Sequence, residues 1–227
     1  MAIVPTTFRK APAALVSYDY VDFASGTGYV TFHPGKVAGP AYIMSPSVFY
    51  SDGVTTTGTG DYATYTQILD LDFDVELNLP RTIEGDCFIS VPMGVVPGPA
   101  DTLTTFGLKY TATVRKVVGG TEEDLGTADC TPYSLTAVSN DGTHPISRHA
   151  AVKITLPRTH FKSGDVLRLN IVLFGKANNT GVWGIGHDPR NRDDDTLNNT
   201  GTVANVVILT AETDSRMDFL VPFKLDT

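Results

Sequence analysis

The segment at residues 68–80, ILDLDFDVELNLP, is the most regular stretch of the chain, and it constrains the fold more than any other feature. Its odd positions are apolar: Leu69, Leu71, Phe73, Val75, Leu77 and Leu79. Its even positions are polar: Asp70, Asp72, Asp74, Glu76 and Asn78. Successive side chains of a β-strand point to opposite faces, whereas an α-helix would distribute these leucines around its circumference. The segment therefore predicts a strand with one face on an apolar core and the other in water.

The polar face of this segment carries a row of carboxylates at Asp70, Asp72, Asp74 and Glu76. Alternate residues of a strand lie roughly 6–7 Å apart, which is too far for neighbours to share one calcium ion easily. A uniform row also lacks the two unlike environments of a catalytic carboxylate pair. Three interpretations remain: a solvated face that discourages edge-to-edge aggregation, a face matched by basic cross-strand neighbours, or a face for a basic partner surface. Basic residues at outward strand positions are Lys109, Arg115, Lys153 and Arg168, and the sequence does not choose among them.

The rest of the chain shows strand patterns and almost no helical pattern. Strand-like runs separated by Gly, Pro, Asn, Asp and Thr are predicted at 14–23, 28–33, 41–50, 63–79, 86–95, 104–118, 124–132, 150–156, 165–175, 181–186, 203–211 and 216–225. Gly119 and Gly120 predict a hairpin turn, and a second turn is expected at residues 162–165. Such a series predicts an all-β fold, namely an antiparallel β-sandwich of the jelly-roll or Greek-key type. We expect a core that contains Leu69, Phe73, Leu77, Leu167, Leu169, Phe219 and Phe223.

No linker, composition step or repeat divides the 227 residues, so residues 13–227 are predicted to form a single β-sandwich domain. Residues 1–12, with prolines at positions 5 and 12, predict an extended N-terminal arm that packs against a neighbouring subunit. Residues 176–204 are rich in Asn, Asp, Gly and Thr and predict a long loop.

Charge and cysteine content exclude several classes of protein. A net charge of −8 disfavours direct binding to nucleic acid or to anionic membranes. No apolar run is long enough to span a bilayer, and the N-terminus lacks the pattern of a signal peptide. Cys87 and Cys130 do not form a disulfide framework, and two free thiols are expected, with Cys87 as a small core residue.

The chain contains no nucleophile-elbow, P-loop, dinucleotide-binding or zinc-protease motif. His144 and His149 are five residues apart, so they share one face of neither a helix nor a strand. The two cysteines also lack the paired spacing of a zinc ligand set. The sequence therefore predicts no catalytic residue, no metal site and no cofactor.

The densest polar cluster is GIGHDPRNRDDD at residues 184–195. Its acidic and amide side chains offer oxygen ligands for calcium, but two arginines among them oppose cation binding. An internally salt-bridged loop is therefore favoured over an ion site. Because loops carry function more often than their scaffolds, the predicted partner-binding residues are His187, Asp188, Arg190 and Arg192.

The C-terminal third resembles a known group of proteins. GHDPRNRDDD at 186–195, the strand pair HFKSGDVLRLNIVLFG at 160–175 and the terminal MDFLVPFKLD at 217–226 are similar to structural proteins from virions of tailed bacteriophages. The resemblance implies a non-enzymatic auxiliary capsid protein of the decoration or cement type, located in the virion and assembled in the host cytoplasm. It also implies a homo-oligomer, expected to be a trimer, that contacts the major capsid protein or other virion proteins.

A second functional class stays open at this point. A carbohydrate- or receptor-binding β-sandwich of a phage tail or cell surface would show aromatic side chains exposed on one sheet face. Tyrosines that would suit this role are Tyr18, Tyr20, Tyr62 and Tyr65. A β-sandwich enzyme ranks behind both classes.

Overall fold

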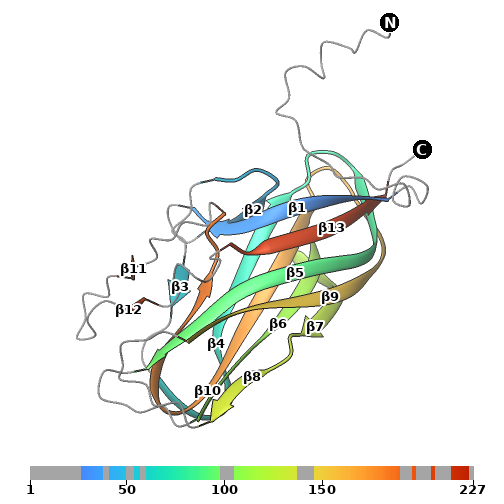
Figure 1. The fold of residues 1–227 in the computed structure, drawn as a ribbon. Helices are drawn as coiled ribbons and strands as arrows, with labels where there is room; N and C mark the ends of the chain where they lie inside the picture. The colour runs from blue at the N-terminus through green and yellow to red at the C-terminus, as the bar shows by residue number, and fades with distance from the viewer. Residues whose placement is uncertain are drawn as a thin grey trace, which may run out of the picture.

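The computed structural model describes residues 27–37, 41–49, 54–56, 60–97, 105–136, 146–189, 196–197, 206–207 and 216–224. Every regular element in these ranges is a β-strand, which confirms the all-β prediction (Figure 1). The strands are β1 (Thr27–Lys36), β2 (Tyr42–Ser45), β3 (Val54–Thr56), β4 (Gly60–Glu76), β5 (Arg81–Pro97), β6 (Thr105–Val118), β7 (Thr121–Asp129), β8 (Tyr133–Thr136), β9 (Ile146–Phe161), β10 (Val166–Gly186), β11 (Thr196–Leu197), β12 (Val206–Val207) and β13 (Asp218–Lys224). The expected arm at 1–12, the strand at 14–23 and most of the strand at 203–211 lie outside the described residues. The described part of the chain contains no helix that could cross a membrane.

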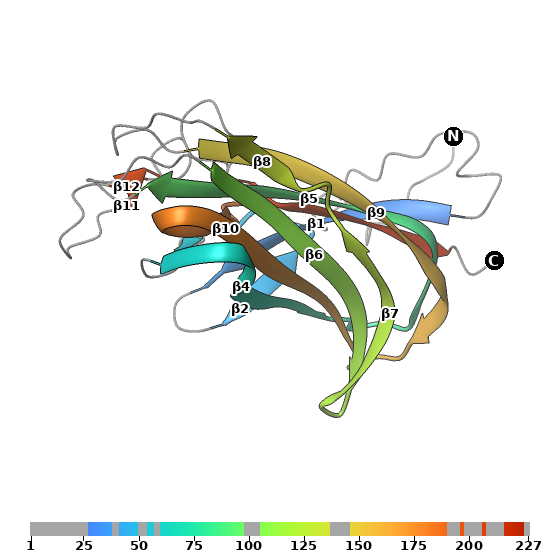
Figure 2. The same ribbon diagram turned by 90° about the horizontal axis from the view of Figure 1, so that it is seen from below.

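The strands form a β-sandwich, as predicted. Eleven of them form one sheet, in which nine follow the order β7-β6-β10-β4-β2-β1-β13-β5-β9, β8 pairs with β6 and β3 pairs with β10. The other two, β11 and β12, pair with each other. The pairings are antiparallel except for one parallel bridge, between Ile43 of β2 and Asp74 of β4. The sheet folds over so that β4, β10, β6 and β7 form one layer and β1, β13, β5 and β9 form the other (Figures 1 and 2).

Strand β10 corrects the predicted loop at 176–204, because it continues to Gly186. Its first half pairs with β6 up to Ala177 and with β4 up to Gly181, and its second half pairs with β5 from Gly181 onward. The strand thus passes from one layer to the other through two register shifts around Ala177. Small, loop-like residues suit this crossing because Trp183 packs beside them: a Cβ at Gly175 would lie 2.5 Å from the indole nitrogen.

Both predicted turns are confirmed. Gly119 and Gly120 join β6 to β7 with φ angles of 56° and 85°, a conformation that favours glycine. The turn between β9 and β10 contains Gly164, with a φ of 89°. Asp165 stabilises this turn, because its carboxylate accepts a hydrogen bond of 2.8 Å from the Lys162 amide.

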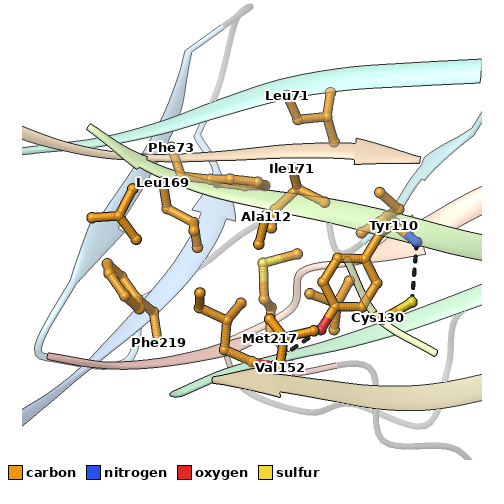
Figure 3. Packing of buried hydrophobic residues seen from close by; sticks show 14 of the residues in the cluster. Leu71, Phe73, Tyr110, Ala112, Cys130, Val152, Leu169, Ile171, Met217 and Phe219 are labelled. Carbon is orange, nitrogen blue, oxygen red and sulfur yellow. Dashed lines mark hydrogen bonds between the residues drawn. The ribbon is translucent and has the colours of Figure 1, made fainter. Parts of the chain in front are cut away.

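The inward faces of the two layers enclose one apolar cluster (Figure 3). The expected core residues Phe73, Leu77, Leu167, Leu169 and Phe219 are buried, whereas Leu69 and Phe223 are only partly buried at its margin. Cys87 and Cys130 are free and buried, as expected.

Tyr110 of β6 links the two layers through the core (Figure 3). Its hydroxyl lies 3.0 Å from the carbonyl oxygen of Ala150 and 3.3 Å from that of Ile89. Its backbone amide donates to the sulfur of Cys130 at 3.1 Å. Desolvation raises the pKa of Tyr110, so its hydroxyl stays protonated and able to donate.

Candidate functional site

The acidic row of β4 is matched by the neighbouring strand β10. The register places Arg168 directly opposite Asp74. The guanidinium donates from Nε and Nη2 to the two carboxylate oxygens of Asp74, both at 2.7 Å, and from Nη1 to Asp72 at 3.2 Å. Asn170, one step along the same face, donates to Asp70 at 2.6 Å and to Asp72 at 2.9 Å. Side chains of β10 therefore form hydrogen bonds with three carboxylates of the row, Asp70, Asp72 and Asp74.

A second arginine extends this network across the layer. Arg115 of β6 lies 2.6 Å from Asp124 and 3.3 Å from Glu122 of β7, and 3.7 Å from Asp72. Burial alone would lower the pKa of Arg115, but the hydrogen bond and charges of these carboxylates outweigh it and raise the pKa. Hydrogen bonding to Asp74 is the main reason that the pKa of Arg168 is also raised. Two permanently charged arginines therefore offset part of the negative charge of the four carboxylates that they contact, which suits stability better than proton transfer.

The outer face of the other layer has different chemistry. Four polar side chains form a row across β1, β13, β5 and β9, namely His33, Asp218, Ser90 and His149. Asp218 pairs directly with Ser90 across the β13–β5 ladder, and His149 pairs with Pro92, the next outward position of β5. Period-two alternation puts them there, because buried residues flank Asp218 and Ser90 on each strand.

Two hydrogen-bonded pairs make up this row. The Ser90 hydroxyl lies 2.7 Å from Nε2 of His149, at an exposed position. Nδ1 of His33 lies 2.8 Å from Asp218, and Nε of Arg216 lies 3.1 Å from the other oxygen of the same carboxylate. An ionised carboxylate only accepts hydrogen bonds, so Nδ1 of His33 carries the proton. Burial alone would raise the pKa of Asp218, but His33 and Arg216 outweigh it and lower the pKa, so Asp218 is a fixed negative charge.

The Ser90–His149 pair places a hydroxyl nucleophile within proton-transfer distance of an imidazole base. A second hydroxyl–imidazole pair on the same two strands is a useful contrast. Thr82 and His160 lie 3.2 Å apart, but Thr82 is buried. Ser90 is half-buried and its partner imidazole is exposed, so a small molecule can reach this pair.

Apolar side chains lie beside the row on the same outer face. Phe88, two residues before Ser90, is 42% exposed. Its cross-strand partner is Leu220, and its ring centroid lies 6.5 Å from that of Tyr29. The Tyr29 hydroxyl donates to the carbonyl of Asp86 at 3.2 Å, which holds the tyrosine ring in place. Phe88, Leu220 and Tyr29 are called the apolar strip below.

The residues predicted to bind a partner lie elsewhere. His187 and Asp188 are fully buried, and the His187 ring packs 5.8 Å from Tyr42 and 5.9 Å from Phe73. The other two, Arg190 and Arg192, lie outside the described residues. The assignment of these four to a partner surface stays a prediction.

The two described tyrosines of the expected cluster pack against different partners. Tyr62 packs against Trp183 with ring centroids 5.1 Å apart, whereas Tyr65 lies under the ammonium group of Lys109 at 5.8 Å. The remaining two, Tyr18 and Tyr20, lie outside the described residues.

Sequence reasoning missed the Ser90–His149 pair. The two residues are 59 positions apart, and only the register of β5 on β9 brings them together. One signal was present: Ser90 is the polar residue between Ile89 and Val91 in an alternating strand, which marks an outward position.

No protein-family model and no curated protein sequence matches the chain. Solved structures do share its fold. One is an α-amino acid ester hydrolase, 9% identical, with a TM-score of 0.51 over 86% of this chain and 36% of that chain. Another is an aminopeptidase from the marine sediment archaeon Thaumarchaeota archaeon, 7% identical, with a TM-score of 0.50 over 87% of this chain and 37% of that chain. The chain thus spans little more than a third of the length of these two structures.

These matches correct the functional prediction. The sequence predicts a non-enzymatic capsid decoration subunit, with a carbohydrate- or receptor-binding module as the alternative. The matched structures that share its fold are hydrolases, so the prediction of a non-enzymatic protein is wrong. The resemblance to phage proteins was carried by local segments, whereas the structural match extends over most of the chain.

Proposed function

We propose that the protein is a hydrolase of ester or amide bonds. The observation that carries the proposal is the fold match to the α-amino acid ester hydrolase, with a TM-score of 0.51 over 86% of this chain. The match to the aminopeptidase, at a TM-score of 0.50, supports the same class of bond. At 9% and 7% identity these matches establish the fold, and the activity is our inference from it.

The test is hydrolysis by the purified 227-residue chain. The substrates are phenylalanine methyl ester, p-nitrophenyl acetate and butyrate, and phenylalanine p-nitroanilide. We expect release of alcohol, nitrophenol or nitroaniline in proportion to protein concentration. The activity must elute with the protein in size-exclusion chromatography and disappear at its unfolding temperature, which separates it from contaminating host esterases. Rates equal to those of the heat-unfolded protein on all of these substrates would overturn the proposal.

A further inference from the structure

We propose that Ser90 is an acyl-accepting nucleophile, that His149 is its base, and that the pair acts on esters with an apolar acyl group. The substrate class rests on the proposed hydrolase function. The nucleophile assignment itself is tested separately below. The supporting geometry is the 2.7 Å contact between the Ser90 hydroxyl and Nε2 of His149 on an exposed sheet face.

Both side chains stand on long, paired strands rather than on loops. Ser90 lies within β5, and His149 lies on β9, with 14 paired positions between the two strands. Strands hold side chains in more precise positions than loops do. For His149 to act as a base, Nε2 accepts the hydroxyl proton of Ser90 while Nδ1 carries the ring proton.

The charges beside the pair suit this role. Asp218, the cross-strand neighbour of Ser90, keeps its carboxylate occupied by His33 and Arg216. It therefore does not compete with His149 for the proton of Ser90. His33, Arg216 and Asp218 therefore form a separate hydrogen-bonded group beside the Ser90–His149 pair.

The reaction balances with water as the only co-reactant. The Ser90 oxygen attacks the ester carbonyl carbon while its proton passes to Nε2 of His149. The bond from the acyl carbon to the alkoxide oxygen breaks, and the alcohol leaves with the proton from His149. Water then attacks the acyl-serine and gives a proton to His149. The acid leaves as that proton returns to the Ser90 oxygen.

The neighbouring apolar strip defines the acyl group. Phe88 is one outward position from Ser90, which corresponds to about 6–7 Å along a strand. It is 42% exposed, with Leu220 as its cross-strand partner and Tyr29 beside it. An acyl chain of a few carbons, attached at Ser90, lies over Phe88 and Leu220 and covers apolar surface there. We therefore expect butyrate to react faster than acetate.

The first experiment is covalent labelling with a fluorophosphonate probe. The serine oxygen forms a bond to phosphorus, fluoride leaves, and the proton passes through His149 to water. Mass spectrometry of the digested wild type should locate the adduct on Ser90. Ser90→Ala and His149→Ala should lower the labelling rate by about 100-fold or more. Labelling on another residue, or unchanged labelling of His149→Ala, would overturn the assignment.

Matched controls come from strand β9 and from the turn that follows it. His160→Ala removes the imidazole of the second hydroxyl–imidazole pair. Ser163→Ala removes an exposed serine in the β9–β10 turn, whose hydroxyl donates to the carbonyl of Asn78. Both controls should label and hydrolyse as the wild type does. Circular dichroism and thermal unfolding show whether Ser90→Ala and His149→Ala keep the fold.

Hydrolysis separates this inference from the proposed function. Wild-type hydrolysis that persists in Ser90→Ala would overturn the nucleophile assignment and leave the hydrolase proposal standing. Adducts on Ser90 without any ester hydrolysis would support the nucleophile and overturn the hydrolase. The acyl-group assignment is tested by Phe88→Ala, which should lower the butyrate-to-acetate ratio of kcat/KM by about tenfold. An unchanged ratio would refute the role of the strip.

Discussion

Replacing Arg168 with methionine tests whether the acidic row of β4 is held by charge pairing. The side chain of Arg168 is only 18% exposed, and it forms a two-pronged contact with Asp74 and single contacts with Asp72 and Glu122. Methionine keeps an apolar stem of similar length but removes every one of these hydrogen bonds. The variant therefore isolates the electrostatic part of the interaction.

The expected loss of stability follows from these contacts. A hydrogen bond to a charged group contributes about 1.5–3 kcal/mol, whereas an exposed ion pair contributes at most about 1 kcal/mol. Asp74 and Asp72 are 35% and 39% exposed, so solvent screening places the contribution of each contact between these two values, at about 1 kcal/mol. The variant also leaves Asp74 without its guanidinium partner, and the repulsion between Asp74 and Asp72, roughly 6–7 Å apart on one strand, is worth about 0.6 kcal/mol in water. We expect a loss of about 2–3 kcal/mol.

Urea unfolding at neutral pH measures this change through the shift of the midpoint at constant slope. The control is Lys224→Met, which removes the pair of Lys224 with Glu84 at 3.7 Å, with side chains 29% and 39% exposed. The control should lose no more than about 1 kcal/mol. If Arg168→Met lowers the free energy of unfolding by less than about 0.5 kcal/mol, the reasoning is refuted, and the carboxylates of β4 only face solvent.

Three further changes test other parts of the structure. Tyr110→Phe should cost about 1–2 kcal/mol in urea unfolding, because the carbonyls of Ile89 and Ala150 lose their shared donor. Asp218 has a lowered pKa, so its stabilising effect is present above the ordinary value of 3.8 and is lost as pH falls through the lower folded value. Asp218→Asn should therefore flatten the acid side of the melting temperature–pH curve, and an unchanged slope would contradict this. Burial raises the pKa of Cys87 to about 12 and also raises that of Cys130, so a thiol reagent at about pH 8 should react with both far faster in denaturant than in the native protein. Rapid native labelling would contradict that burial.

The sequence predicted the faces of the strands better than their neighbours. Period-two alternation identified the inward side of β4 and β10, because burial of alternate residues is a local consequence of strand geometry. The full length of β10 was missed because its small residues are typical of loops. In the structure, Gly175 is a strand residue that leaves room for the indole ring of Trp183. Pairs such as Arg168 with Asp74, 94 positions apart, depend on register, which the alternation of one strand does not specify.

The two outer faces of the sandwich differ in what their charges can do. The carboxylates of the β4–β10–β6–β7 face are paired with Arg168 and Arg115, which keep their charge at any physiological pH. The opposite face carries His33 and His149, and a neutral imidazole has one nitrogen that accepts a proton and one that donates it. Proton transfer at neutral pH needs a group that can both take and return a proton, which arginine cannot do. The more charged face therefore stabilises the fold, and the candidate chemistry belongs to the less charged face.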